Sequence, residues 1–180
     1  MSDVRHRCFI SYHHDDEDEV QDFIKTFDEE RDVFIARALG TDMEQGIIDS
    51  DDTDYVMRRI RELYLKDATV TIVLIGKCTW ARRYVDWGIQ ASLRHGETVT
   101  PLGLLGILLP SMGKKANAPE RLDANLKDKD GNELYARWYV YPQRKDTLAN
   151  RIDDAFGARS SRADLIVNTR DRFKINRPCP

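Results

Sequence analysis

Residues 69–77, TVTIVLIGK, decide the fold of this chain of 180 residues. The first seven residues of the stretch are β-branched or apolar and carry no charge, and Gly76 and Lys77 end the run. A strand without charge on either face is typical of the middle of a parallel sheet that helices cover on both sides. We therefore expect a parallel sheet with this strand at its centre.

The rest of the chain alternates between predicted strands and helices. Short apolar runs predict strands at residues 7–12, 31–39, 102–109 and 137–141, and helical spacing of apolar residues predicts helices at 16–30, 51–65 and 147–156. The helix after the central strand is expected to bury Val85, Ile89 and Leu93 and to end at His95 and Gly96. Residues 40–51 and 111–134 are expected to be loops, the second a long surface loop with one helical turn near 121–126.

Strands joined by helices predict an α/β fold built as a three-layer sandwich. Right-handed crossovers and a switch point near the first strand favour a five-stranded parallel sheet in the flavodoxin-like order 2-1-3-4-5. The length fits a single domain of residues 1–180, with a core at about 5–157. The basic and polar tail at 158–180 is expected either to pack back on the domain or to fray.

Composition narrows the classes of partner. The net charge of −3 argues against a protein that coats nucleic acid. The start lacks the apolar core of a signal peptide, and no apolar run approaches the roughly 20 residues of a membrane span. The three cysteines are far apart and unpatterned, so we expect reduced thiols in a cytoplasmic protein. Because CxxC and HExxH motifs are absent, no metal site is predicted.

A ligand crevice is expected where the first and central strands end. Ligands of such sheets lie outside the carboxyl ends of the strands, at the point where neighbouring connections diverge. The walls of this crevice would be residues 11–15 and 76–83. The chain has no P-loop, GxGxxG or GxSxG motif, so the phosphate cradles of those folds are absent.

The first wall offers a hydroxyl, an aromatic ring and two imidazoles. One interpretation is ligand contact, in which Tyr12 stacks on the ligand while Ser11 and His13 bind its sugar or phosphate. The alternative is a polar turn in which Asp15 or Asp16 caps the following helix.

The second wall contributes cations and aromatic rings, namely Lys77, Trp80, Arg82, Arg83 and Tyr84. Arginines beside a helix N-terminus suit a phosphate or pyrophosphate, and an indole can stack on a base. The alternative is that the arginines pair with surface acids and that the aromatic rings pack the start of the helix.

Three segments resemble the bacterial TIR-like family, in the branch that includes the TIR-like proteins of Thoeris anti-phage defence. They are CFISYHHDDE at residues 8–17, TVTIVLIG at 69–76 and TWARRYVDWGIQASL at 79–93. The first is similar to the family's FISYxxxD strand and loop, and the second to its VLIG strand. The resemblance covers residues 5–110, and the last third of the chain is compatible with it.

The resemblance implies NAD as a substrate, with no bound cofactor. The family's enzymes cleave the bond between nicotinamide and ribose, and some cyclise ADP-ribose into a signal for a nucleotide-sensing effector. They commonly self-associate to complete their sites. A glutamate on the helix after the central strand stabilises the positive charge that develops on the ribose.

In this chain the place of that glutamate is Gly88, which supplies no charge and costs up to about 1 kcal/mol inside a helix. Three explanations stay open: a non-catalytic member, a Glu-to-Gly change in an active enzyme, or replacement by Asp86. Asp86 precedes Gly88 by two positions and so points roughly 200° away around the helix. The residues favour a nucleotide site that lacks its main carboxylate.

Two other functions compete with NAD processing. One is a non-catalytic TIR-like module that self-assembles or docks onto a partner, which Gly88 favours. The other is a flavodoxin-like electron carrier, for which the chain lacks a recognisable phosphate loop.

Overall fold

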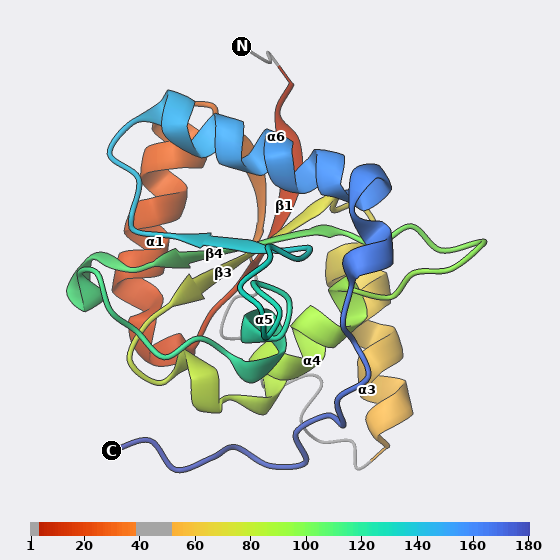
Figure 1. Cartoon of the computed structure of the whole chain (residues 1–180). Coiled ribbons are helices and arrows are strands. Elements are labelled where there is room, and N and C mark those ends of the chain that lie inside the picture. The colour runs from red at the N-terminus through yellow and green to blue at the C-terminus, as the bar shows by residue number, and fades with distance from the viewer. Residues whose placement is uncertain (1–3, 39–51) are drawn as a thin grey trace.

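The structure, a computed structural model, describes residues 4–38 and 52–180. Its centre is a five-stranded parallel sheet in the order β2-β1-β3-β4-β5 (Figure 1). The strands are β1 (His6–Ser11), β2 (Phe34–Ala38), β3 (Val70–Ile75), β4 (Gly103–Leu108) and β5 (Arg137–Tyr139). The predicted strand order 2-1-3-4-5 is confirmed.

Strand β3 occupies the centre of the sheet, as its composition predicts. All of its residues are buried. It pairs with β1 as far as Ser11↔Val73 and with β4 along its whole length. Its β-branched, uncharged side chains meet helices on both faces, which is the environment that such a run suits.

Helices cover both faces of the sheet and make the three layers of a sandwich (Figure 1). One face carries α1 (Glu17–Ile24) and α6 (Lys145–Ser161), and the other carries α3 (Thr53–Ile60), α4 (Arg83–Ser92) and α5 (Glu120–Asp123). Short 3-10 turns lie at His14–Asp16, Thr79–Ala81, Pro110–Met112 and Ala163–Leu165. The predicted seam of α4 is buried at Val85, Ile89 and Leu93.

Helices α1 and α3 each continue into a π-helical segment, Lys25–Glu30 and Arg61–Leu65. Because the first of these segments extends to Glu30, β2 begins at Phe34 and not at residue 31 as predicted. The turn between this segment and β2 places Asp32 in the left-handed region with φ 53°. The predicted loop at 40–51 lies outside the described residues.

The helix predicted at 147–156 is longer, because it passes through Gly157 and packs Ala158 against the core before it ends. The prediction that 111–134 is a surface loop is only partly right. This segment contains α5, and the side chain of Arg121 within it is fully buried. The tail packs back over α4 and α5, so the expectation that it packs on the domain is confirmed and the alternative that it frays is not (Figure 1).

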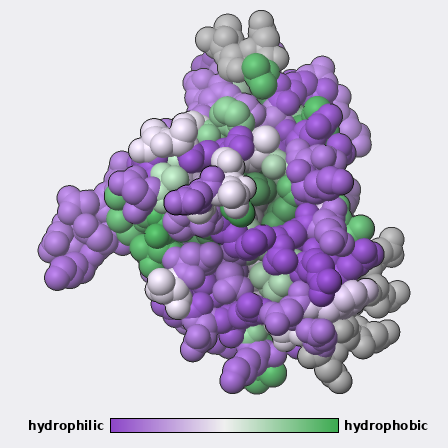
Figure 2. Space-filling model, turned by 90° about the vertical axis from the view of Figure 1, so that its right-hand side faces the viewer, coloured by the Kyte–Doolittle hydropathy of each residue, from purple (hydrophilic) through white to green (hydrophobic). Residues whose placement is uncertain are grey.

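The molecular surface is rich in charge. The face shown in Figure 2 is mostly hydrophilic, and hydrophobic residues show on it in separate areas. Among the described residues, no helix combines the length and the apolar character needed to cross a membrane.

Two glycines offer a matched test of the packing between β4 and α6. A Cβ atom built at Gly103 would lie 2.3 Å from the carbonyl oxygen of Ala155 in α6, whereas one at Gly157 meets no atom within 4 Å. We expect Gly103→Ala to lower the free energy of unfolding by about 1–3 kcal/mol, because the backbone of α6 must move. Gly157→Ala is expected to raise it by about 0.5–1 kcal/mol, because alanine favours the helix. Urea denaturation of both variants measures the difference, and equal losses would contradict the close packing.

Candidate functional site

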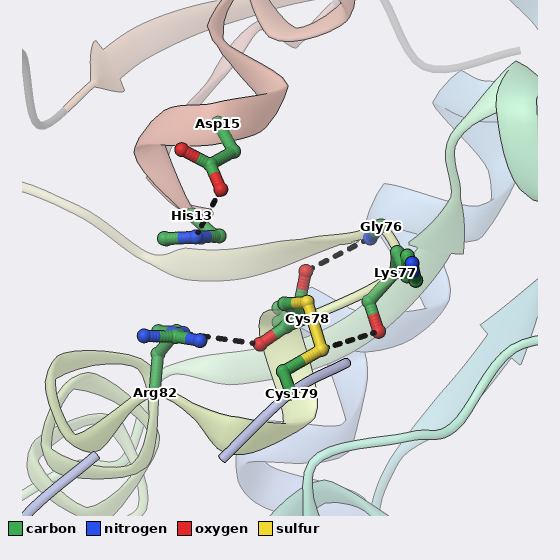
Figure 3. Close-up of a disulfide and its surroundings, with 8 residues drawn as sticks. His13, Asp15, Gly76, Lys77, Cys78, Arg82 and Cys179 are labelled. Carbon is green, nitrogen blue, oxygen red and sulfur yellow. Dashed lines mark hydrogen bonds and ion pairs between the residues drawn. A yellow bond between two sulfur atoms is a disulfide. The ribbon is translucent and has the colours of Figure 1, made fainter. Parts of the chain in front are cut away.

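The carboxyl ends of β1 and β3 lie side by side at the switch point of the sheet. Beyond them the chain runs to opposite faces, into α1 after β1 and into α4 after β3. Figure 3 shows what gathers there: His13 and Asp15 from the first loop face residues 76–82 of the second. The structure therefore brings the two predicted walls together.

His13 is an enclosed side chain of the first wall, with 4% of its surface exposed. Its Nε2 atom lies 3.1 Å from one carboxylate oxygen of Asp15, and Nε2 of His14 lies 3.1 Å from the other. Burial lowers the pKa of His13, and the neighbouring His14 and Arg82 lower it further against the opposing effect of Asp15. The imidazole of His13 is thus held neutral near pH 7.

The side chains of His13, His14 and Asp15 each offer one atom that can bind a metal ion, and these atoms lie within 4.8 Å of one another. Imidazole nitrogens and a carboxylate suit a zinc-class ion. The sequence predicts no metal site, and the guanidinium of Arg82, which is close enough to lower the pKa of His13, opposes a second cation there.

Asp16 is a site residue that the sequence analysis missed. Its carboxylate lies so close to Gly76 that a Cβ atom there would be 2.1 Å from Oδ2, so a larger residue at position 76 would require this carboxylate to move. This Oδ2 atom is buried without a hydrogen-bond partner, and Asp16 makes no side-chain cap to α1. Burial, Glu19 and Asp15 raise the pKa of Asp16. An unsatisfied carboxylate with a raised pKa at a sheet switch point is the usual sign of a functional group, but only the tertiary structure reveals it.

The loop after β3 is tied to the strand by its own side chains. The hydroxyl of Thr79 accepts a hydrogen bond of 2.8 Å from the backbone N–H of Gly76, and Nε of Arg82 donates to the carbonyl of Cys78. Lys77 is exposed and Trp80 is half-buried. Lys77 and Arg82 therefore lie in the loop beside His13 (Figure 3), and Trp80 belongs to the same loop.

Tyr12 lies apart from the rest of the predicted set. Its ring packs against the core under α1 and α6, and its hydroxyl donates a 2.7 Å hydrogen bond to Glu17. Gly88 approaches the sheet from the opposite face. Tyr12 and Gly88 therefore lie on different sides of the sheet, because successive side chains along a strand point to opposite faces.

The N-terminus of α4, which was expected to meet phosphate, is occupied by the C-terminal tail. The backbone N–H of Arg83 donates to Oδ1 of Asn176 at 2.9 Å, and its guanidinium donates to the carbonyl of Lys174. The guanidinium also lies over the rings of Tyr84 and Trp87. Among the described residues, Arg83 forms no ion pair with an acid, and Tyr84 packs the helix start.

A disulfide joins the tail to the same loop. Cys78 and Cys179 are bonded although 101 positions separate them, and only Cys8, buried in the core, is a free thiol (Figure 3). The prediction of three reduced cysteines is wrong at these two positions. The spacing of the cysteines could not reveal the pair, because the tail reaches Cys78 only after it has packed across α4.

Position 88 faces the end of β1. A Cβ atom at Gly88 would lie 3.3 Å from the ring of Phe9 and 3.8 Å from Oγ of Ser11, and Gly88 itself is buried. Ser92 closes this turn of the helix by donating to the carbonyl of Gly88 and by sharing a 2.6 Å hydrogen bond with Thr71. A side chain at position 88 would therefore point first at the buried ring of Phe9 and then at the hydroxyl of Ser11, which is 2% exposed.

Asp86 faces in another direction and has a structural role. Arg121 donates to both of its carboxylate oxygens, at 2.8 and 3.3 Å, and the backbone N–H of Phe173 donates to one of them at 2.9 Å. The side chain of Asp86 is buried. Sequence reasoning could not find this ion pair, because Arg121 lies 35 residues away in a segment predicted to be a loop.

The fold and the crevice define a flavodoxin-like α/β domain with a candidate ligand site at its switch point. The family of the Thoeris protein ThsB, TIR-like domain, matches residues 9–114, more than half of the chain. The chain belongs to this family, and it is a defence-related TIR-like module. No curated protein matches it.

The buried pair of Asp86 and Arg121 can be tested by removing one partner. We expect Asp86→Ala to lower the free energy of unfolding by about 3–5 kcal/mol, because the guanidinium of Arg121 would stay buried and unpaired. The matched control is Asp146→Ala, whose partner Arg144 is largely exposed, and its loss should stay below about 1 kcal/mol. Chemical denaturation compares them, and similar losses would refute the structural role of Asp86.

The environment of His13 predicts its titration. Because the pKa of His13 is lowered, its NMR titration midpoint should lie below the ordinary value of about 6.5. As the pH falls below that value, the unfolded state binds more protons than the folded one, so the stability of the protein decreases. His13→Gln should remove this part of the decrease, and a midpoint at or above the ordinary value would contradict the assignment.

Proposed function

We propose that this chain is a nucleotide-recognising TIR-like domain of Thoeris defence whose ligand is NAD. In the proposal the nucleotide lies at the β1–β3 switch point, between Ser11 and His13 on one side and Lys77, Trp80 and Arg82 on the other. The observation that carries the proposal is the direction of position 88, which faces the ring of Phe9 and, at a longer distance, the Ser11 hydroxyl at the end of β1. The family's catalytic glutamate would stand in that place.

The chemistry follows from what occupies position 88. Cleavage between nicotinamide and ribose passes through an oxocarbenium-like state, which a nearby carboxylate stabilises. Gly88 supplies no such charge, and both carboxylate oxygens of Asp86 are held by Arg121. The domain is thus proposed to bind NAD and to lack the group that drives its cleavage.

Asp16 adds a second acid to the site, with a different use. Burial and the neighbouring Glu19 and Asp15 raise its pKa, and its buried Oδ2 atom has no hydrogen-bond partner, so this oxygen can accept a hydrogen bond from a ribose hydroxyl. Asp16 is therefore proposed as a ligand-binding group and not as a substitute for the missing carboxylate.

A second candidate is a non-catalytic interaction module that self-assembles or docks onto a partner. Two observations favour it: Gly88 carries no catalytic group, and the tail covers the N-terminus of α4 where a phosphate was expected. In this alternative the crevice is a remnant of the family's site. A product-sensing effector would then have no signal from this chain.

Gain of activity at position 88 tests the proposal. Gly88→Glu and its uncharged match Gly88→Gln are incubated with NAD, with and without dithiothreitol, and nicotinamide is measured by chromatography. We expect release from the Glu variant alone, because only it restores the carboxylate. Circular dichroism checks that both variants fold, since the new side chain must pass Phe9.

The outcome that overturns the proposal is equally concrete. If the folded Gly88→Glu variant releases no nicotinamide, and the unmodified chain binds neither NAD nor ADP-ribose in calorimetry, the interaction module is the better description. Binding of ADP-ribose by the unmodified chain, without release of nicotinamide, supports a nucleotide site that lacks its carboxylate.

A further inference from the structure

The tail beyond α6 consists of two parts that are held very differently. Residues 167–173 are anchored to buried side chains of α4 and of the segment around α5. Asn125 and Val167 exchange a pair of hydrogen bonds of 2.7 and 2.8 Å, and Arg121, fully buried, donates to the carbonyls of Arg170 and Asp171. Phe173 closes this part, because its N–H donates to Asp86 and its carbonyl accepts from the indole of Trp87.

Residues 174–180, which we call the strap, are held at the start of α4 and at one residue of α5. Apart from the disulfide, its contacts include three hydrogen bonds, from Arg83 to the carbonyl of Lys174, from Arg83 to Asn176 and from Arg177 to the carbonyl of Ala81, and an ion pair between Arg177 and Glu120. Most of the strap is exposed, and Cys179 near its end is bonded to Cys78. The strap therefore depends on the disulfide more than the anchored part does.

The strap lies on groups that were assigned to the ligand. Oδ1 of Asn176 accepts a hydrogen bond from the backbone N–H of Arg83, the first residue of α4. The carbonyl of Lys174 accepts a hydrogen bond from the guanidinium of Arg83. Cys78 lies in the loop that carries Lys77, Trp80 and Arg82 (Figure 3). A phosphate at the N-terminus of α4 would have to displace the strap, because both need the same donors.

We propose that the bond between Cys78 and Cys179 is a redox-sensitive modification site that locks the strap over the nucleotide site, and that its reduction opens the site. This inference rests on the proposed function for the identity of the ligand. The release of the strap itself does not depend on it.

The chemical step is thiol–disulfide exchange with a dithiol reductant. A thiolate of the dithiol attacks one sulfur of the disulfide, and its second thiol then completes the exchange. The S–S bond breaks, Cys78 and Cys179 become thiols, and the dithiol becomes a cyclic disulfide, so two electrons and two protons pass to the protein. Both cysteines are partly exposed, which gives a small reductant access.

After reduction, three hydrogen bonds and the ion pair between Arg177 and Glu120 are left to hold the strap, whose residues 174–178 are exposed. Exposed segments held by few contacts open locally at low cost, whereas the anchored part is tied to the buried side chains of Arg121 and Asn125. Extended from Phe173, the strap can swing its end by up to about 24 Å, at 3.3–3.6 Å per residue. The movement is therefore large enough to clear the end of α4.

Hydrogen exchange measures the release directly, without any ligand. The probes are the backbone amides of Arg177 and Arg83, which bond across the strap, and the controls are those of Val167 and Phe173 in the anchored part. On treatment with dithiothreitol we expect the two probes to exchange at least about tenfold faster and the two controls to stay unchanged. Equal exchange of the probes before and after reduction would overturn the lock.

Calorimetry with ADP-ribose then measures whether the strap covers the site. Reduction, or the substitution Cys179→Ser, is expected to tighten binding at least about tenfold. As a matched control, dithiothreitol should have no further effect on the Cys179→Ser variant, which shows that it acts through this disulfide alone.

The outcomes separate the two ideas. Equal binding of ADP-ribose by the oxidised and reduced protein overturns the proposal that the strap covers the site and leaves the nucleotide function standing. If no form binds ADP-ribose although the strap is released, both the nucleotide function and the proposal that the strap covers its site are overturned. Tighter binding only after release supports both.

Discussion

The buried ion pair between Asp86 on α4 and Arg121 on α5 organises the half of the molecule that surrounds the candidate site. A guanidinium inside a protein must be paired and hydrogen-bonded, since the cost of removing it from water is several kcal/mol. Arg121 meets this requirement with Asp86 on one side and with oxygens of Asn168, Arg170 and Asp171 on the other. The pair thus joins α4 and α5 and also fixes the direction in which the tail leaves α6.

That direction has a consequence for the crevice. Because the tail is laid along α4, its end arrives at the loop after β3, and Cys179 meets Cys78. The tail then competes with any ligand for the donors at the start of α4. A feature that stabilises the fold therefore also determines which groups of the site are open and which are covered.

The open part of the site lies on the other side of the same loop. His13 is held neutral by burial and by neighbouring cations, Asp16 carries a buried oxygen without a partner, and Ser11 faces position 88. These groups can bind a sugar or a phosphate, but they include no ionised carboxylate beside position 88. The site is suited to recognition of a nucleotide more than to its cleavage, which agrees with what Gly88 alone indicates.

Much of the architecture could be predicted from the sequence, because burial on both faces, helical periodicity and the alternation of strands and helices are local patterns. They were sufficient to derive the central place of β3, the strand order and the two loops that meet at the switch point. The missed features were the burial of Asp86 and Arg121, the disulfide, the separation of Tyr12 from position 88, and the unsatisfied carboxylate oxygen of Asp16. Each of these depends on partners brought close by packing, from the other face of the sheet or from distant parts of the chain, and such a meeting leaves no periodic signal. The sequence by itself determined the sheet and the place of its switch point, and only the tertiary structure decided which side chains and which part of the tail gather there.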